Sequence, residues 1–292
     1  MADPKNVAVV GLGIMGGAIA GNLAAAGFAV AGYDTDAGQM AALAERGVRR
    51  SNSAAGAAGG AAVALTSLPS VAALETVAAD LAAQPVPGLV VIEASTLPIA
   101  AKEAARERLA AAGMTLLDCP LSGTGAQAAT KDLAVYASGD EAAFGRCRAV
   151  FDGFARVTHY LGAFGNGSRM KYVANLLVAV HNAVAAEAIV LGTKAGLDPA
   201  RILEVITSGA GNSRILELRG PMMVAGLYTP PTATMHVLQK DSAIIGEFAR
   251  ALGVPTPLLD AAAPLYDEAA AEGHVEEDVA AVHAVLARRA GL

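Results

Sequence analysis

A glycine-rich turn near the N-terminus constrains the fold of this chain more than any other feature. Val7–Val10 is an apolar run typical of a buried strand, and residues 11–16 then follow the pattern Gly-x-Gly-x-x-Gly and open an alanine-rich segment. In such a turn Gly11 permits a tight bend, Gly13 admits a close ligand and Gly16 lets the following helix pack on the sheet. Free N–H groups at a helix start favour an anion. The pattern predicts a pyrophosphate-binding loop that comprises Gly11, Leu12, Gly13, Ile14 and Met15.

An acidic residue follows the second predicted strand. Ala29–Tyr33 is apolar and is followed by Asp34, about 20 residues after Gly13. A carboxylate at this point accepts hydrogen bonds from the adenosine ribose and repels a 2′-phosphate, so we expect NAD, with NADP as the alternative. Asp34 has a second interpretation, as a cap of the next helix beside Thr35 and Asp36.

Short apolar runs alternate with helical stretches over the first 160 residues, which predicts an α/β Rossmann domain with a doubly wound, mostly parallel sheet. Leu133–Ala137 and Val157–Tyr160 flank a helix near 140–151 and are expected to extend that sheet. The other predicted strands are Val7–Val10, Ala29–Tyr33, Ala61–Thr66, Leu89–Glu93 and Thr115–Asp118, and the helices lie near 14–26, 37–46, 70–82 and 98–112.

The pattern changes to continuous helical periodicity after Gly167. A long interdomain helix is predicted at about 168–195, closed by Gly196, with Asp198 and Pro199 opening the next helix. We therefore expect a nucleotide-binding domain at 1–163 and an all-α C-terminal domain at 164–292. Its further helices are expected at about 198–208, 213–225, 234–252, 257–271 and 275–290.

Small polar residues follow the later strands, where a parallel sheet places its ligands. Ser67, Leu68 and Thr96 are expected to contact the cofactor, although Ser67 and Thr96 are also suited to cap helices. In Ser122-Gly123-Thr124, successive backbone N–H groups and two hydroxyls suit a substrate carboxylate.

A polar stripe interrupts the apolar long helix. Lys171, Asn175 and Asn182 fall within about 40° of one direction, since each residue turns a helix by about 100°. A solvated stripe, or a lysine reaching the surface, is the alternative to a functional stripe. Beside a dinucleotide domain, we favour the functional interpretation.

These motifs together resemble the β-hydroxyacid dehydrogenases of the 3-hydroxyisobutyrate dehydrogenase group, which are related to 6-phosphogluconate dehydrogenase. The similarity spans nearly the whole chain. The segments that carry it are the glycine loop with Asn22-Leu23 and Gly27, Ser95-Thr96, Asp118–Gly123, Gly165–Asn175 and Lys240-Asp241.

The resemblance implies an oxidoreductase that transfers a hydride between NAD(P) and a small 3-hydroxy acid of the 3-hydroxyisobutyrate, tartronate semialdehyde or threonate type. It implies that Lys171 is the general acid/base, that Asn175 and Ser122-Gly123-Thr124 hold the substrate, and that Lys240 reaches the cofactor. Asn175 and Ser122 are counted with Lys171 as catalytic. Desolvation would bring the pKa of Lys171 towards neutrality.

Departures from the family pattern concern the substrate. Thr124, Gln127 and Lys131 stand where relatives have further glycines, and Ala174 precedes Asn175 where Asn or His is common. Residues 209–213 and 226–230 look somewhat like threonate dehydrogenase-like members. The alternatives are an imine reductase-like NADPH enzyme, against which Lys171 argues, and a non-catalytic NAD-binding module.

Composition narrows the partners of the chain. The net charge is −6 and the basic residues are dispersed, so no nucleic-acid partner is expected. We expect no metal, no membrane span, a cytoplasmic location, and Cys119 and Cys147 as buried thiols. Apolar faces in the helical half, together with the resemblance, predict a homodimer or homotetramer formed through that domain.

Overall fold

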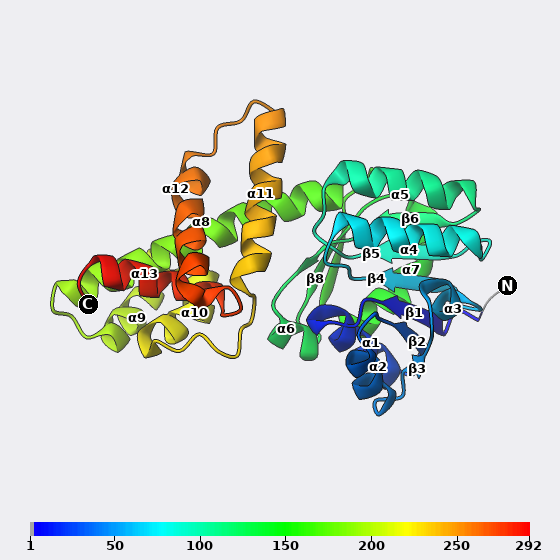
Figure 1. The fold of residues 1–292 in the computed structure, drawn as a ribbon, viewed down its shortest axis with the longest axis horizontal. Helices are drawn as coiled ribbons and strands as arrows, with labels where there is room; N and C mark the ends of the chain where they lie inside the picture. Colours follow the sequence, from blue (N-terminus) through cyan, green and yellow to red (C-terminus); the bar gives the residue numbers. More distant parts are fainter. Residues whose placement is uncertain (1–2) are drawn as a thin grey trace. The chain divides into compact units, whose positions relative to one another are not determined.

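The computed structural model describes residues 3–292, which form two compact units (Figure 1). The first, called here the N-terminal unit, ends at Lys171, and the second, the helical unit, is Tyr172–Leu292. The long helix α8 (Asn166–Lys194) begins in the first unit and continues in the second.

A six-stranded parallel sheet with the order β3-β2-β1-β4-β5-β6 forms the centre of the N-terminal unit. The order reverses between β1 and β4, and in parallel sheets of this kind ligands bind beyond the carboxyl ends of the strands at such a point. The predicted Rossmann architecture is confirmed. The strands are β1 (Asn6–Val10), β2 (Ala29–Tyr33), β3 (Arg49–Arg50), β4 (Val63–Thr66), β5 (Val90–Glu93) and β6 (Thr115–Asp118).

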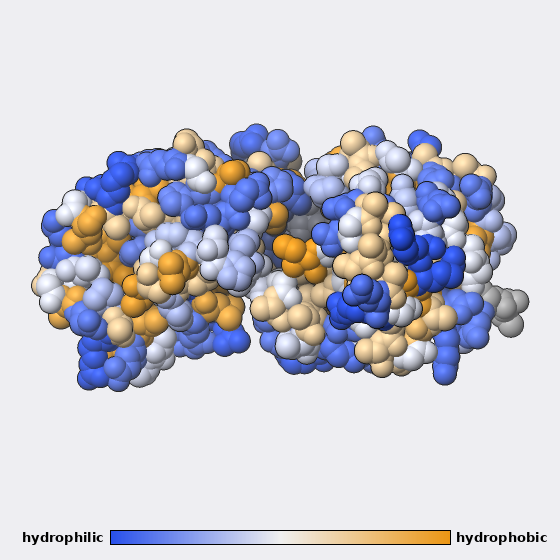
Figure 2. All heavy atoms as spheres, turned by 60° about the horizontal axis from the view of Figure 1, so that its bottom comes forward, coloured by the Kyte–Doolittle hydropathy of each residue, from blue (hydrophilic) through white to orange (hydrophobic). Residues whose placement is uncertain are grey.

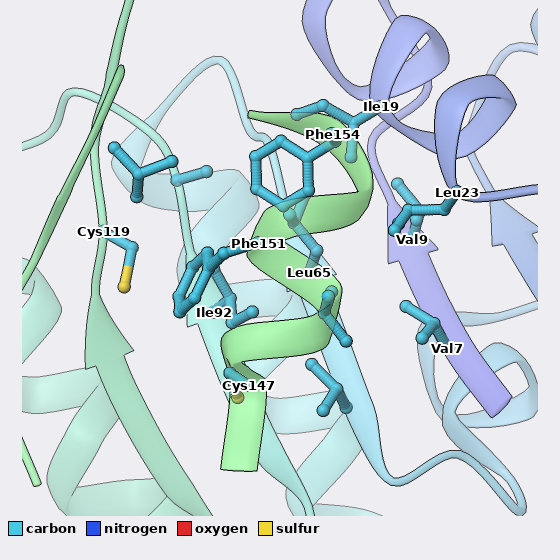
Figure 3. Close-up of a cluster of buried hydrophobic side chains, with 14 of the residues drawn as sticks. Val7, Val9, Ile19, Leu23, Leu65, Ile92, Cys119, Cys147, Phe151 and Phe154 are labelled. Carbon is cyan, nitrogen blue, oxygen red and sulfur yellow. The ribbon is translucent and has the colours of Figure 1, made fainter. Parts of the chain in front are cut away.

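Helices cover both faces of this sheet, because its strands are apolar on both sides. Alternate residues of β1 enter different clusters: Val7 and Val9 pack with α1 and α7, whereas Ala8 and Val10 pack with α3, α4 and α5. Figure 3 shows the first cluster, with side chains from α7 close to those of the central strands. The helices are α1 (Ile14–Ala25), α2 (Ala37–Ala44), α3 (Ala54–Ala58), α4 (Val71–Ala83), α5 (Ile99–Ala111) and α7 (Glu141–Phe154).

The last strands of the N-terminal unit form a separate sheet, so the expectation that 133–137 and 157–160 extend the main sheet is wrong. They are β8 (Ala134–Ala137) and β9 (Val157–Tyr160), and they pair with β7 (Leu121–Ser122) in the order β7-β8-β9. Towards β6 there is an isolated bridge, Asp118 to Ser138. Beyond this bridge the segment after β6 stays antiparallel to β8: the N–H of Tyr136 donates to the carbonyl of Pro120 (3.0 Å), and Leu121 then pairs with Val135 in β7. Pro120 has no N–H to return a hydrogen bond, so β8 pairs regularly with β7 and not with β6.

The helical unit follows the predicted order of helices. Asp198 caps α9 with Pro199 at its first position, and Gly196 has a φ of +89°, as predicted. The expected helix at 275–290 begins later: Asp278 is extended, bridges to Thr234 and caps a 3₁₀ turn at Val279–Ala281. The helices are α9 (Pro199–Thr207), α10 (Arg214–Ala225), α11 (Met235–Ala251), α12 (Pro257–Ala269), a π turn (Ala270–His274) and α13 (Val282–Arg289).

Helix α8 is long and apolar enough, by length and composition, to cross a membrane. Its most apolar 18 residues have a mean hydropathy of 1.7, and 39% of them are buried. Asn175 and Asn182 are buried on its inner side, where they bond to other helices of the helical unit. On the face drawn in Figure 2, hydrophobic side chains are interspersed with hydrophilic ones. We therefore assign α8 to the core of the helical unit.

Candidate active site

The glycine loop leaves the start of α1 open to a ligand. Gly11 has a φ of +83°, and a Cβ there would lie 2.1 Å from the carbonyl oxygen of Ser67, so only glycine fits. A Cβ on Gly13 would meet nothing within 4 Å, and Gly13 provides no side-chain cap for α1. The first N–H groups of a helix need partners from outside it. The loop therefore fits the pyrophosphate of a dinucleotide.

Asp34 supports this loop from the end of β2. Its Oδ2 accepts the N–H of Leu12 (2.5 Å) and its Oδ1 accepts that of Asp36 (2.8 Å). Helix α2 is capped by Asp36, which accepts from Gly38 and Gln39, so the interpretation of Asp34 as the cap is wrong. A carboxylate held beside the glycine loop is suited to accept ribose hydroxyls.

The loops after β4 and β5 are joined by hydrogen bonds. The N–H of Ser67 donates to the carbonyl of Val10 (2.9 Å), and the N–H of Leu68 donates to the hydroxyl of Ser95 (2.8 Å). The side chain of Ser70 caps α4, so the capping interpretation of Ser67 is wrong. The N-cap position of α5 is Pro98, which provides no side-chain cap. Ser67, Leu68 and Thr96 thus lie in the loops at the carboxyl edge of the sheet, beside the glycine loop.

The segment predicted to hold the substrate carboxylate follows β6. Gly123 has a φ of +141°, and Ser122 is half-buried in β7. The N–H of Thr124 donates to Oε1 of Gln127 (3.0 Å), and Thr124 caps α6 (Gly125–Ala129). The amide oxygen of Gln127 thus accepts one of the N–H groups that we expected to bind the substrate carboxylate. The N–H of Thr124 can bind a carboxylate only if the side chain of Gln127 moves away from it.

The polar stripe of α8 is buried and not a solvated surface. Lys171 and Asn175 are one turn apart on the same face, and both are buried. Within the helical unit, Nδ2 of Asn175 donates to Oδ2 of Asp241 (2.7 Å), and Nζ of Lys240 lies 3.3 Å from Oδ1 of Asp241. The predicted residues Asn175, Lys240 and Asp241 are therefore brought together, and Asp241 orients the amide of Asn175.

Asn182, the third member of the stripe, has a structural role. Its amide donates to the carbonyl of Val279 (2.8 Å) and to the hydroxyl of Tyr266 (3.2 Å). The Tyr266 hydroxyl in turn donates to the carbonyl of Ala179 (2.5 Å). Burial raises the pKa of Tyr266 to about 12, so this hydroxyl stays protonated and donates at neutral pH.

A buried charge cluster in the N-terminal unit was not predicted from the sequence. Lys102, Glu93 and Asp118 are each 0% exposed, and Nζ of Lys102 lies 2.6 Å from Glu93 and 2.8 Å from Asp118. A signal was present, because Lys102 shares the buried face of α5 with Ala105 and Leu109 at helical spacing. A lysine in an apolar stripe indicates a buried ionic partner.

Both cysteines are buried and unbonded to each other, as predicted. Figure 3 shows Cys119 and Cys147 in the apolar cluster of the N-terminal unit. Burial raises the pKa of Cys147 to about 12, and the pKa of Cys119 is also raised well above its usual value, chiefly by burial. Neither thiol is therefore a nucleophile at neutral pH.

Comparison with known proteins assigns the family. Residues 6–162 match the NAD binding domain of 6-phosphogluconate dehydrogenase, and residues 165–286 match the family described as "NAD-binding of NADP-dependent 3-hydroxyisobutyrate dehydrogenase". The chain is 36% identical to L-threonate dehydrogenase from Cupriavidus necator over 95% of each chain. It is 31% identical to a probable 3-hydroxyisobutyrate dehydrogenase from Mycobacterium tuberculosis over 97% of this chain and 98% of the relative.

A solved structure agrees with these relatives. The crystal structure of 3-hydroxyisobutyrate dehydrogenase from Salmonella typhimurium is 33% identical and superposes with a TM-score of 0.88, covering 96% of this chain and 99% of that one. The glycine loop, the parallel sheet and the long helix therefore have the arrangement of a known enzyme group. The chain belongs to the β-hydroxyacid dehydrogenase family and is an NAD(P)-dependent hydroxy-acid dehydrogenase.

Proposed function

We propose that the chain oxidises a small 3-hydroxy acid with NAD, and that Lys171 exchanges the hydroxyl proton. The observation that carries the proposal is the pair Lys171 and Asn175, buried one turn apart on the same face of α8. A lysine and an amide at this spacing can hold one hydroxyl between a proton acceptor and a hydrogen-bond donor. The substrates named for the relatives, L-threonate and 3-hydroxyisobutyrate, are the first compounds to test.

The roles follow from the chemistry of each group. The nicotinamide ring of the bound cofactor supplies the hydride acceptor. Lys171, as a neutral amine, takes the hydroxyl proton while the carbinol carbon loses hydride, and in the reverse direction its ammonium protonates the carbonyl oxygen. Asn175, oriented by Asp241, binds the substrate oxygen. Ser122, Gly123 and Thr124 bind the carboxylate, with Gln127 released from the N–H of Thr124.

The cofactor is bound by the loops at the carboxyl edge of the sheet. The N-terminus of α1, with Gly11, Gly13 and the backbone of Leu12, Ile14 and Met15, binds the pyrophosphate. Asp34 accepts the ribose hydroxyls, which favours NAD over NADP. Ser67, Leu68 and Thr96 line the route to the nicotinamide, and Lys240 contributes from α11. We place the boundary between the cofactor-binding domain and the helical domain near residue 163.

The test compares two lysines of the same helix. Lys171→Met should lower kcat by at least about 100-fold, because proton transfer by a positioned side chain contributes about 10²–10⁴. Binding of NAD, followed by fluorescence titration, should be unchanged. Lys194→Met, at the exposed end of α8, is the matched control and should keep full activity. An active Lys171→Met enzyme would show that another group moves the proton.

We further propose a homodimer or homotetramer built through the helical unit. Val184 and Leu191 lie on an exposed face of α8, 55% and 71% accessible, and large apolar surfaces of this kind are typical of subunit interfaces. Sedimentation velocity measures the state directly. A monomer at micromolar concentration would contradict the proposal.

A further inference from the structure

The buried ion triad of the N-terminal unit combines two carboxylates with one lysine. Nζ of Lys102 contacts Glu93 (2.6 Å) and Asp118 (2.8 Å) and donates to the carbonyl of Ser95 (2.6 Å). Complete burial by itself lowers the pKa of Lys102, but Glu93 and Asp118 more than offset this and raise it above its usual value. The lysine is therefore charged. Such clusters are costly to bury, and removing one member is more costly still.

One carboxylate of the triad lies at the start of α8. Oδ2 of Asp118 accepts the backbone N–H of Ser168 (2.8 Å), and Oδ1 accepts its hydroxyl (2.8 Å). The hydroxyl of Ser138, which itself donates to Asp118, accepts the N–H of Gly167 (2.9 Å). These N–H groups belong to the first turn, where a helix has no internal acceptors and its dipole favours an anion. Asp118 thus anchors the helix that carries Lys171.

The other carboxylate is bonded to a loop assigned to the cofactor. Oε1 of Glu93 accepts the N–H of Ser95 (3.0 Å), and the Ser95 hydroxyl accepts the N–H of Leu68 (2.8 Å). Lys102 therefore connects two segments. It donates to the carbonyl of Ser95 in the loop after β5, and it pairs with Asp118, which binds the start of α8.

We propose that Lys102 is a positioning residue that acts on Lys171 through Asp118 and Ser168. This inference rests on the proposed role of Lys171 as proton acceptor. Ser168 is three residues before Lys171, which is about 4.5 Å along the helix axis. Loss of the anchor would let the first turn of α8 shift, and a displacement of about 1 Å at a reacting group can cost about 100-fold in rate. Lys102 itself is 0% exposed, so it acts through its partners and not by direct contact with a ligand.

Two variants remove the anchor to different degrees. Ser168→Ala removes one hydrogen bond to Asp118 and leaves the triad intact, and it should lower kcat by about 10-fold. The double variant Lys102→Met/Glu93→Gln removes one charge of each sign, so that the buried net charge is unchanged, and it should lower kcat by about 100-fold. Ser53→Ala is the matched control, because it removes the hydroxyl that caps α3 in the same unit.

Two readouts separate positioning from stability. With a substrate deuterated at the carbinol carbon, the isotope effect on kcat should rise in Ser168→Ala, because the chemical step becomes slower. Amide hydrogen exchange of a peptide covering residues 165–172 should accelerate in the same variant. Ser53→Ala should change neither, at a temperature where both proteins are folded. The double variant should show larger changes of the same sign.

The outcomes distinguish this inference from the proposed function. If Lys171→Met is inactive but Ser168→Ala keeps the kcat and isotope effect of the wild type, the positioning role is overturned and the proposed function stands. If Lys171→Met is active, the proposed function fails, and positioning of Lys171 fails with it. A lowered kcat, a raised isotope effect and faster exchange at 165–172 together establish the role of the triad.

Discussion

Gly167→Ala tests how closely the first turn of α8 packs against β6 and β8 within the N-terminal unit. A Cβ at this position would lie 2.2 Å from the carbonyl oxygen of Tyr136 and 2.7 Å from that of Asp118. Ordinary contacts begin near 3.4 Å, so the first turn of α8 must retreat by about 1 Å to accept a methyl group. The neighbouring atoms are backbone, which cannot rotate away as a flexible side chain would.

The expected loss of stability follows from these distances. Overpacking costs about 1–3 kcal/mol, and stretching the bonds from Ser168 to the buried Asp118 costs about 1.5–3 kcal/mol. The greater helix propensity of alanine returns at most about 1 kcal/mol. The net destabilisation is about 1.5–6 kcal/mol, which lowers Tm by roughly 3–24 °C for a unit of this size.

The assay is thermal unfolding followed by circular dichroism, with Gly145→Ala as the matched control. Gly145 lies inside α7 of the same unit, and a Cβ there would meet nothing within 4 Å. The same substitution should stabilise the protein there by about 0.5–1 kcal/mol. Opposite signs are thus expected at the two glycines. If Gly167→Ala were as stable as Gly145→Ala, the close approach of α8 to β6 and β8 would be refuted.

Two further predictions concern single carboxylates. Asp34→Ser should shift the ratio of kcat/KM for NAD over NADP towards NADP by at least about 10-fold, because an anion near the 2′-phosphate is removed; Asp36→Ser, which retains a capping side chain, should leave the ratio unchanged. Asp278 is buried, which by itself raises its pKa, but Arg219 and hydrogen bonds from Thr232 and Ala280 lower it below the usual value. Its contribution to stability is therefore full above about pH 3.9 and is lost as the pH falls through the lower folded pKa. Urea unfolding of wild type and Asp278→Asn should differ at pH 7 and converge in acid; a constant difference would contradict the assignment.

The sequence alone predicted the parallel sheet of the N-terminal unit and the order of the helices, because these features depend on residues that are close together in the chain. The turn at Gly11, the alternation of short strands with helices, and the capping of α9 by Asp198 each depend on a few neighbouring residues. The same holds for Asp34 and Ser67, which follow β2 and β4, since the carboxyl ends of parallel strands lie at one edge of the sheet. Ser122 lies within β7 of the second sheet, which was not predicted.

Tertiary structure decided what depends on residues far apart in the chain. The strands at 134–137 and 157–160 form a separate sheet because β8 pairs along its length with β7, the segment after β6, and meets β6 only at the bridge from Asp118 to Ser138; no local periodicity reveals this. Asn182 bonds to Val279 across 97 positions of sequence, so its role in the core was decided by the folded chain. The bond from Thr124 to Gln127 is by contrast local, three residues apart in a capping box. The ion triad shows the reason most clearly. Lys102 lies on α5 and its partners end β5 and β6, and only the folded chain brings the three charges together with the start of α8.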